Sequence, residues 1–192
     1  MRRKAVSPHK YGLCFAFLIA GMAATGMASG AELSSDGANR IRFAATQLDV
    51  AVEGEFKTFT AEIDFDPSKP ETSNVDVSID LASVATGSAD ADTVLKGRDL
   101  FDVAHFPRAV FTSTKITMVS QGHYQALGRL TVKGHSADLT VPFAARSGPD
   151  GLTVEGGVPI SRLAYRVGEG EWSDAGTLAD LVQLQFRLRL LH

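Results

Sequence analysis

The side chains that could support catalysis or hold a metal ion are few and widely spaced in this sequence. Beyond the first 31 residues the histidines are His105, His123, His135 and His192, and no H-E-x-x-H or H-x-H element pairs them. Zinc and copper sites depend on such pairing, so we expect no metal site. No G-x-S-x-G element marks a serine nucleophile either.

The acidic residues give equally little sign of a catalytic centre. Asp64 and Asp66 fall on the polar side of a predicted strand, and Asp90 and Asp92 fall at the start of a predicted helix, where acids suit the helix dipole. Residues 168–173 are similar to a G-x-G-x-x-G loop, but their acidic side chains would repel a pyrophosphate. We therefore predict no catalytic residue and a protein that binds rather than reacts.

The first 31 residues have the pattern of a secretory signal peptide. Basic residues 2–4 precede an apolar run over residues 11–28, and small residues follow up to Ala31, after which we expect cleavage. A retained membrane anchor is the alternative, because the run approaches spanning length. Cys14, the single cysteine, lies in this segment. The predicted mature domain, residues 32–192, therefore has no disulfide and no thiolate ligand.

The charge of the predicted mature domain excludes one class of partner. Of 19 basic side chains, four lie in the first 31 residues, which leaves 15 against 22 acidic ones and a net charge of −7. An acidic domain without a basic patch is a poor ligand for nucleic acid, so we expect no nucleic-acid partner.

Alternation of apolar and polar residues runs through the remaining sequence. A period of two is typical of half-buried antiparallel strands. Turn signals such as those at residues 66–68, 120–122, 133–135 and 148–151 separate about eight strands. One stretch, residues 88–99, instead predicts a short helix capped by Ser88.

So many strands in one domain must protect their edges, and closure into a barrel does this best. A barrel of about eight strands either fills with side chains or holds one small ligand. Small residues occur among the large inward ones; they are Ala61, Ala126, Gly128, Ala145 and Gly156. They leave room for a ligand but equally allow tight packing, so a ligand-holding barrel and a solid sandwich remain open on pattern alone.

An ordered set of motifs resembles the YceI-like family. Residues 100–107 (LFDVAHFP) with 110–114 (VFTST) are similar to the family's passage from helix to strand. Residues 79–84 (IDLASV), 128–134 (GRLTVKG) and 168–174 (GEGEWSD) match further segments, and shorter matches at residues 56–59 and 65–67 complete the set. The resemblance extends over residues 39–190.

The resemblance implies an all-β fold, a lipocalin-like antiparallel β-barrel with one short helix over its mouth. It also implies a periplasmic protein that holds a long apolar chain of the isoprenoid class, a polyprenyl lipid or an isoprenoid quinone, without catalysis and without a required cofactor. Other hypotheses are a quinone-binding accessory to a membrane cytochrome, a lipid-modifying enzyme and a ligand-free structural domain. A homodimer is a further expectation from the family.

The sequence departs from the family pattern at two places. Where members often have I-N-R-x-D-F-G, this chain has ISRLAYR over residues 160–166, with Ala164 and Arg166 in place of Asp and Gly. The sequence therefore leaves open whether the usual turn forms there. Ala91 and Val94 occupy helix positions where Arg and His are frequent, so no polar contact to a ligand is predicted from them.

Strand parity and residue size predict which side chains line an apolar tunnel. The helix and the segment after it supply four that we expect to form a lid, and the strands supply the rest. The predicted lid residues are Leu95, Leu100, Phe101 and Phe106. The predicted strand residues are Phe43, Phe59, Ile63, Val77, Ile79, Phe111, Leu130, Val132, Val141, Phe143, Val158, Ile160, Leu184 and Phe186.

Overall fold

Alternating side chains build one curled antiparallel sheet. The computed structural model describes residues 31–34, 38–149 and 151–190. Within these residues eleven strands follow one another in the order β1-β4-β5-β7-β8-β9-β10-β11-β2-β3-β6. The strands are β1 (Ala31–Ser34), β2 (Arg40–Gln47), β3 (Val50–Phe56), β4 (Thr58–Asp64), β5 (Asn74–Asp80), β6 (Val84–Ala85), β7 (Arg108–Ser120), β8 (His123–Val132), β9 (His135–Gly148), β10 (Gly151–Ser161) and β11 (Leu181–Leu190).

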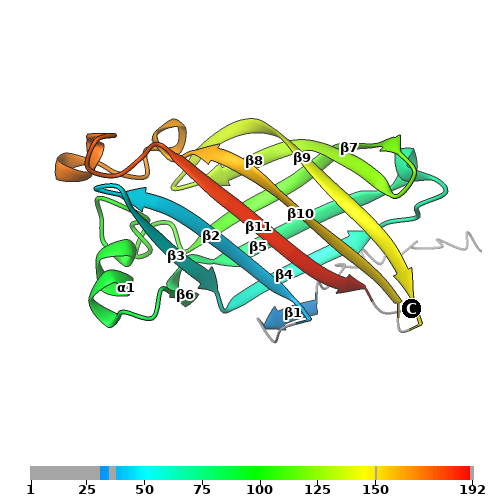
Figure 1. The fold of residues 1–192 in the computed structure, drawn as a ribbon, viewed down its shortest axis with the longest axis horizontal. Coiled ribbons are helices and arrows are strands. Elements are labelled where there is room, and N and C mark those ends of the chain that lie inside the picture. Colours follow the sequence, from blue (N-terminus) through cyan, green and yellow to red (C-terminus); the bar gives the residue numbers. More distant parts are fainter. Residues whose placement is uncertain (1–30, 35–37, 150, 191–192) are drawn as a thin grey trace, which may run out of the picture.

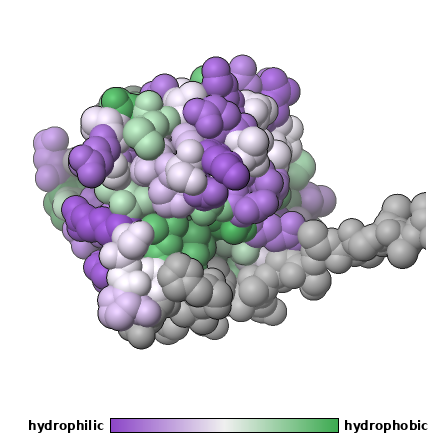
Figure 2. All heavy atoms as spheres, turned by 90° about the vertical axis from the view of Figure 1, so that its right-hand side faces the viewer, coloured by the Kyte–Doolittle hydropathy of each residue, from purple (hydrophilic) through white to green (hydrophobic). Residues whose placement is uncertain are grey.

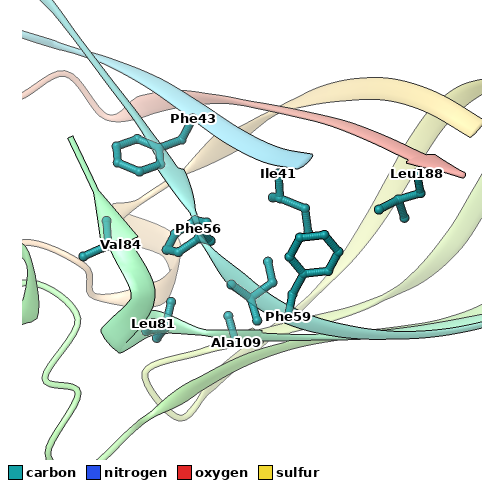
Figure 3. Close-up of a cluster of buried hydrophobic side chains, with 9 residues drawn as sticks. Ile41, Phe43, Phe56, Phe59, Leu81, Val84, Ala109 and Leu188 are labelled. Atoms are coloured by element: carbon teal, nitrogen blue, oxygen red, sulfur yellow. The ribbon is translucent and has the colours of Figure 1, made fainter. Parts of the chain in front are cut away.

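The sheet curls into an incompletely closed barrel (Figure 1). No backbone ladder between β1 and β6 is found in the described part of the chain, so hydrophobic side chains close the wall instead. Ile41 of β2 and Phe59 of β4 point toward one another, and both belong to one buried cluster with Phe56 and Leu188 (Figure 3). This packing provides the closure that hydrogen bonds supply elsewhere.

In the long strands, every second side chain faces the interior of the barrel. In β11, Val182, Leu184 and Phe186 are partly buried while Gln183 and Gln185 are exposed, which is the pattern expected of a wall with one face in water. The apolar side chains of this strand therefore face the interior of the barrel, and the polar ones face the solvent.

Small residues in the wall make space that neighbouring rings fill. A Cβ added at Gly128 would overlap the Thr112 carbonyl oxygen and the Phe111 ring, and one at Gly156 would overlap the Phe186 ring. Two of the small residues noted in the sequence, Gly128 and Gly156, therefore make room for aromatic side chains.

One α-helix covers an end of the barrel. Helix α1 (Ala89–Lys96) lies at the left of Figure 1, and the Ser88 hydroxyl accepts a hydrogen bond from the Ala91 N–H at its start. The predicted capped helix is confirmed, although it ends before Asp99. The described residues also form four 3-10 helices: η1 (Pro70–Thr72), η2 (Leu81–Ser83), η3 (Leu163–Tyr165) and η4 (Gly170–Ser173).

The predicted all-β barrel class is confirmed, and the number of strands is corrected from about eight to eleven. Strand β6 has two residues, too few for any periodicity, and β3 carries Gly54 between two acids. Strand β1 begins at Ala31, the last residue of the predicted signal peptide, whose other residues lie outside the described part. In the described residues no helix is long and apolar enough to cross a membrane.

The two ends of the barrel differ. Helix α1 lies at one end, together with residues 162–180, which we call the mouth loop. The opposite end, seen in Figure 2, has apolar side chains near its centre with hydrophilic ones around them.

Candidate ligand-binding cavity

Two adjoining cavities occupy the barrel. The larger, which we call the outer chamber, has a volume of about 390 Å³ and lies at the α1 end. The smaller, the inner chamber, has a volume of about 100 Å³ and lies deeper. Ile79, Ala109, Leu130 and Leu184 line both chambers, and we call these four residues the waist. The waist side chains come from β5, β7, β8 and β11, so they narrow the interior from several sides.

The outer chamber is apolar with a few polar groups. Its polar and ionisable lining residues are Gln47, Asp90, Arg162 and Tyr165. Burial raises the pKa of the Tyr165 phenol, which keeps this group neutral over the ordinary range. Beyond the waist, its apolar lining consists of Phe43, Ala45, Val52, Phe56, Leu81, Ala91, Val94, Leu95, Leu100, Phe101, Val132, Ile160, Val167, Trp172, Leu178 and Val182.

Arg162 holds the mouth loop in place. The side chain is 4% exposed, and its N–H groups donate to three backbone carbonyls: Nε to Ala179 (3.0 Å), Nη1 to Val167 (2.9 Å) and Nη2 to Leu178 (2.5 Å). Burial lowers the pKa of Arg162, and the carboxylate of Asp180 acts in the opposite direction. A guanidinium stays protonated in proteins, so a positive charge lies in the chamber wall.

A second polar contact joins the mouth loop to the β8–β9 turn. The Lys133 ammonium, on a side chain that is 6% exposed, donates to Glu169 (3.0 Å) and to the Arg166 carbonyl (3.2 Å). The hydrogen bond and the charge of Lys133 lower the pKa of Glu169. The backbone N–H of Glu169 also donates to the Asp99 carbonyl (2.8 Å). The mouth loop is therefore tied both to the barrel wall and to the segment after α1.

The inner chamber is lined by apolar side chains and ends at three aromatic rings. Phe65 meets Tyr124 edge-on at 5.0 Å and Phe143 at 5.3 Å between ring centroids, while Tyr124 and Phe143 stack at 5.4 Å. The Tyr124 hydroxyl donates to the Pro67 carbonyl (3.3 Å). We call Phe65, Tyr124 and Phe143 the aromatic floor; Phe65 and Phe143 line the chamber, and Tyr124 packs against both of them. The other lining residues are Ile41, Ile63, Val75, Val77, Phe111, Ala126, Leu139, Val141, Val154, Phe186 and Leu188, with the waist.

A comparison with known protein families shows which family the chain resembles. A family model described as a YceI-like domain matches residues 35–190. The chain belongs to the YceI-like family. Curated relatives include UPF0312 proteins of Pseudomonas savastanoi pv. phaseolicola, 31% identical over 90 residues, and of Yersinia pestis, 35% identical over 88 residues. Those alignments cover 47% and 45% of the relatives, so the chain spans about half the length of the curated relatives it matches.

Solved structures share the fold over a larger part of the chain. BcnA of Burkholderia cenocepacia is 34% identical, covers 81% of this chain and 98% of its own, and superposes with a TM-score of 0.77. A YCEI protein of Campylobacter jejuni is 28% identical, with coverage of 73% and 85% and a TM-score of 0.67. A polyisoprenoid binding domain from Saccharophagus degradans is 15% identical over 83% of this chain and 97% of its own, with a TM-score of 0.61, and this likeness concerns the fold alone.

Most of the predicted tunnel residues of this YceI-like chain line one of the chambers. Those in the outer chamber are Phe43, Leu95, Leu100, Phe101, Val132 and Ile160. Those in the inner chamber are Ile63, Val77, Phe111, Val141, Phe143 and Phe186, and Ile79, Leu130 and Leu184 line both. The structure thus brings these side chains together, while their contact with a ligand stays a prediction.

Three predicted tunnel residues lie elsewhere. Phe59 is 1% exposed and packs in the seam between β2 and β4, where it helps to close the wall. Phe106, predicted as part of the lid, is 36% exposed and covers the β8–β9 turn at Gly134 on the outside. Val158 is buried in β10 but lines neither chamber. Parity placed these side chains on the apolar face, but it does not distinguish a cavity wall from a packed seam.

The two departures from the family pattern have different outcomes. Ala91 and Val94 line the outer chamber and make its helix side apolar. The turn that Arg166 was expected to disturb does form, because Arg166 adopts the left-handed conformation with φ 52° and donates its N–H to Leu163. The sequence left this turn open, and the structure contains it.

Sequence reasoning missed lining residues of both kinds, in strands, such as Val52 and Val75, and in the mouth loop. Arg162, Tyr165 and Leu178 line the outer chamber, although no alternation marks them. Trp172 of the same loop also lines this chamber.

Ionisable side chains reach the interior from segments outside the long strands. Asp90 on α1 and Arg162 and Tyr165 of the mouth loop are ionisable and line the outer chamber.

The other described residues considered for chemistry lie outside the chambers, and His192 lies outside the described part of the chain. His105 contacts Asp102 at 2.9 Å on the surface, and His123 contacts the Gln121 carbonyl at 3.1 Å. Asp92 accepts hydrogen bonds from the N–H and hydroxyl of Thr86, which lower its pKa. Across the residues that the structure describes, no group of three or more His, Cys, Asp or Glu is arranged to hold a metal ion.

Proposed function

We propose that this protein is a non-catalytic carrier or store for a long apolar lipid of the isoprenoid class. The observation that carries the proposal is an interior of two adjoining chambers, one of them wholly apolar. Each CH₂ group transferred from water into such a space gains about 0.8 kcal/mol. A narrow apolar interior therefore binds a hydrocarbon chain with few polar contacts.

The distribution of polar groups supports one orientation of the lipid. Gln47, Asp90, Arg162 and Tyr165 all line the outer chamber. A polar head group would lie among them at the mouth, where its hydrogen bonds can be satisfied, and the hydrocarbon tail would point toward the aromatic floor. The positive charge of Arg162 favours a head group that carries an accepting oxygen.

The location we propose is the periplasm, reached by way of the predicted signal peptide. Fractionation of cells that produce the chain tests this directly: we expect the protein in the periplasmic fraction, shortened at its N-terminus. Recovery of the full-length chain from the membrane fraction would instead favour the retained anchor.

Identification of the bound lipid tests the carrier function. Native mass spectrometry of protein purified from its own compartment should show one prenyl lipid per chain, and organic extraction should return the lipid unmodified. An empty protein that also fails to bind added prenyl alcohols would overturn the proposal in favour of a ligand-free structural domain. Recovery of a chemically altered lipid after incubation would favour an enzyme.

The same extraction separates the quinone alternative from the lipid carrier. Gln47, Arg162 and Tyr165 can donate hydrogen bonds to a quinone carbonyl as readily as to another oxygen. A quinone that is reduced and reoxidised while bound would favour an accessory to a membrane cytochrome. The mass of the intact assembly also tests the expected homodimer.

A further inference from the structure

The inner chamber has a defined end. Tyr124 of β8 and Phe143 of β9 are directly opposite one another in neighbouring strands, and Phe65, which follows β4, packs against both rings. Tyr124 and Phe143 are nearly inaccessible to solvent, and the hydroxyl of Tyr124 is held by the Pro67 carbonyl. A tail that entered from the mouth and reached this end of the inner chamber would therefore meet packed rings.

The volumes of the two chambers set how much hydrocarbon fits above this floor. A protein cavity of about 150 Å³ holds one benzene molecule, a group of six carbons. On that scale the outer chamber of about 390 Å³ takes about three isoprene units, and the inner chamber of about 100 Å³ takes about one. The waist lies between the chamber that takes about three units and the chamber that takes about one.

We infer that the aromatic floor measures the length of the lipid tail, so that binding strengthens up to about four isoprene units and not beyond. The inference rests on the proposed function and adds to it a preferred chain length and the residues that set it. Longer prenyl chains still bind, but their additional units remain outside the mouth. The waist residue Ala109 admits the last unit, since a larger side chain there would separate the inner chamber from the outer one.

The experiment is a titration with prenyl alcohols of two, three, four, five and eight isoprene units. Trp172 is the single tryptophan of the sequence and lines the outer chamber, so its fluorescence reports occupancy. Affinity should rise with each added unit, by about fourfold for each CH₂ that becomes buried. It should then level off at about four units.

Two substitutions should move this plateau in opposite directions. Phe143→Ala removes a floor ring and should extend the rise in affinity to about five units, while Ala109→Leu fills the waist and should stop it at about three. Phe143→Leu serves as a milder form if Phe143→Ala fails to fold. Phe59→Leu is the matched control, since Phe59 is buried but lines neither chamber; it should lower stability and leave the plateau unchanged.

The outcomes separate the two proposals. If no prenyl alcohol changes Trp172 fluorescence or is retained by the protein, the proposed function fails. If the alcohols bind but affinity keeps rising through eight units, or if the plateau is the same in Phe143→Leu, Ala109→Leu and Phe59→Leu, the lipid-binding proposal stands and the aromatic floor does not measure chain length.

Discussion

The inner and outer chambers share the waist but are built from different parts of the chain. The inner chamber is lined by strand residues together with Phe65, and its side chains are apolar. The outer chamber adds α1, the segment after it and the mouth loop, and these additions carry Asp90, Arg162 and Tyr165. Strands therefore determine how deep the interior is, and the segments between strands determine what reaches it and what polar group rests at its entrance.

The two chambers should differ in how far they support the fold. Phe143→Ala should lower the free energy of unfolding by about 3–5 kcal/mol, because a buried ring is lost from packed surroundings. Trp172→Ala, in the partly exposed mouth loop, should lower it by only about 1–2 kcal/mol. Denaturant unfolding of both variants measures the contrast, and equal losses would show that the mouth loop is as integral to the core as the floor.

Removal of the Arg162 guanidinium should loosen the outer chamber alone. Arg162→Met leaves the carbonyls of Val167, Leu178 and Ala179 without their present donor, at a cost of about 2–4 kcal/mol. Hydrogen exchange of residues 166–180 should accelerate, while amides of β8 and β9 stay protected. Arg162→Lys is the control, because it keeps the charge but lacks the planar set of donors. Its exchange rate should fall between those of the parent protein and Arg162→Met. Uniform acceleration throughout the barrel would contradict a local role.

The same contrast explains what could be predicted from sequence. Strand residues such as Phe43, Val77 and Leu184 were placed inward by alternation alone, because parity is a local property and the barrel has one apolar side. Phe59 and Val158 have the same parity and yet line no chamber. Whether an inward side chain borders a cavity depends on the residues opposite it, and these are distant in sequence.

The mouth loop could not be predicted in this way. The buried Arg162 side chain donates hydrogen bonds to carbonyls up to 17 residues away. No periodic pattern in the sequence predicts such contacts. Arg166 shows a related difficulty: the missing glycine left the turn open, and the structure forms the turn with arginine in the left-handed conformation. Loop conformations depend on tertiary contacts that can override local preference, and this is why the motif resemblance located the segment without describing its geometry.

Acid should loosen the mouth before the floor. Hydrogen bonds lower the pKa values of Asp92, Glu169 and Asp174 at the mouth, and of Asp66 near the floor. A carboxylate whose folded pKa is lowered stabilises the fold above its ordinary value, here 3.8 for Asp and 4.5 for Glu, and this contribution is lost as the pH falls through the lowered value. Three such groups at the mouth against one near the floor should make the mouth the more acid-sensitive end.

The rate at which a bound ligand dissociates measures the acid sensitivity of the mouth. Between about pH 5 and pH 3 the dissociation of a bound prenyl alcohol should accelerate, followed by Trp172 fluorescence, while protection of inner-chamber amides changes less. Glu169→Gln should raise the dissociation rate above that pH range and weaken its pH dependence, because the ion pair with Lys133 is already lost. Dissociation with no pH dependence in either protein would rule out the contribution of these carboxylates.

The smallest expected effect is a gain in stability at the mouth. Arg166 has φ 52°, a conformation that costs a residue with a Cβ about 1–2 kcal/mol and costs glycine little. Glycine gives back part of that gain by making the unfolded chain more flexible, so Arg166→Gly should raise stability by about 0.5–1 kcal/mol. The Arg166 carbonyl, which accepts from Lys133, is kept by the substitution.

Thermal unfolding of Arg166→Gly and Arg166→Ala isolates the backbone contribution. Both substitutions remove the same charge and side chain, but alanine keeps the Cβ and should be no more stable than the parent protein. A higher melting temperature in the glycine variant alone would show that the turn is formed against its local preference. The tertiary contacts of the mouth loop would then be what holds it, as the hydrogen bonds of Lys133 and Arg162 indicate.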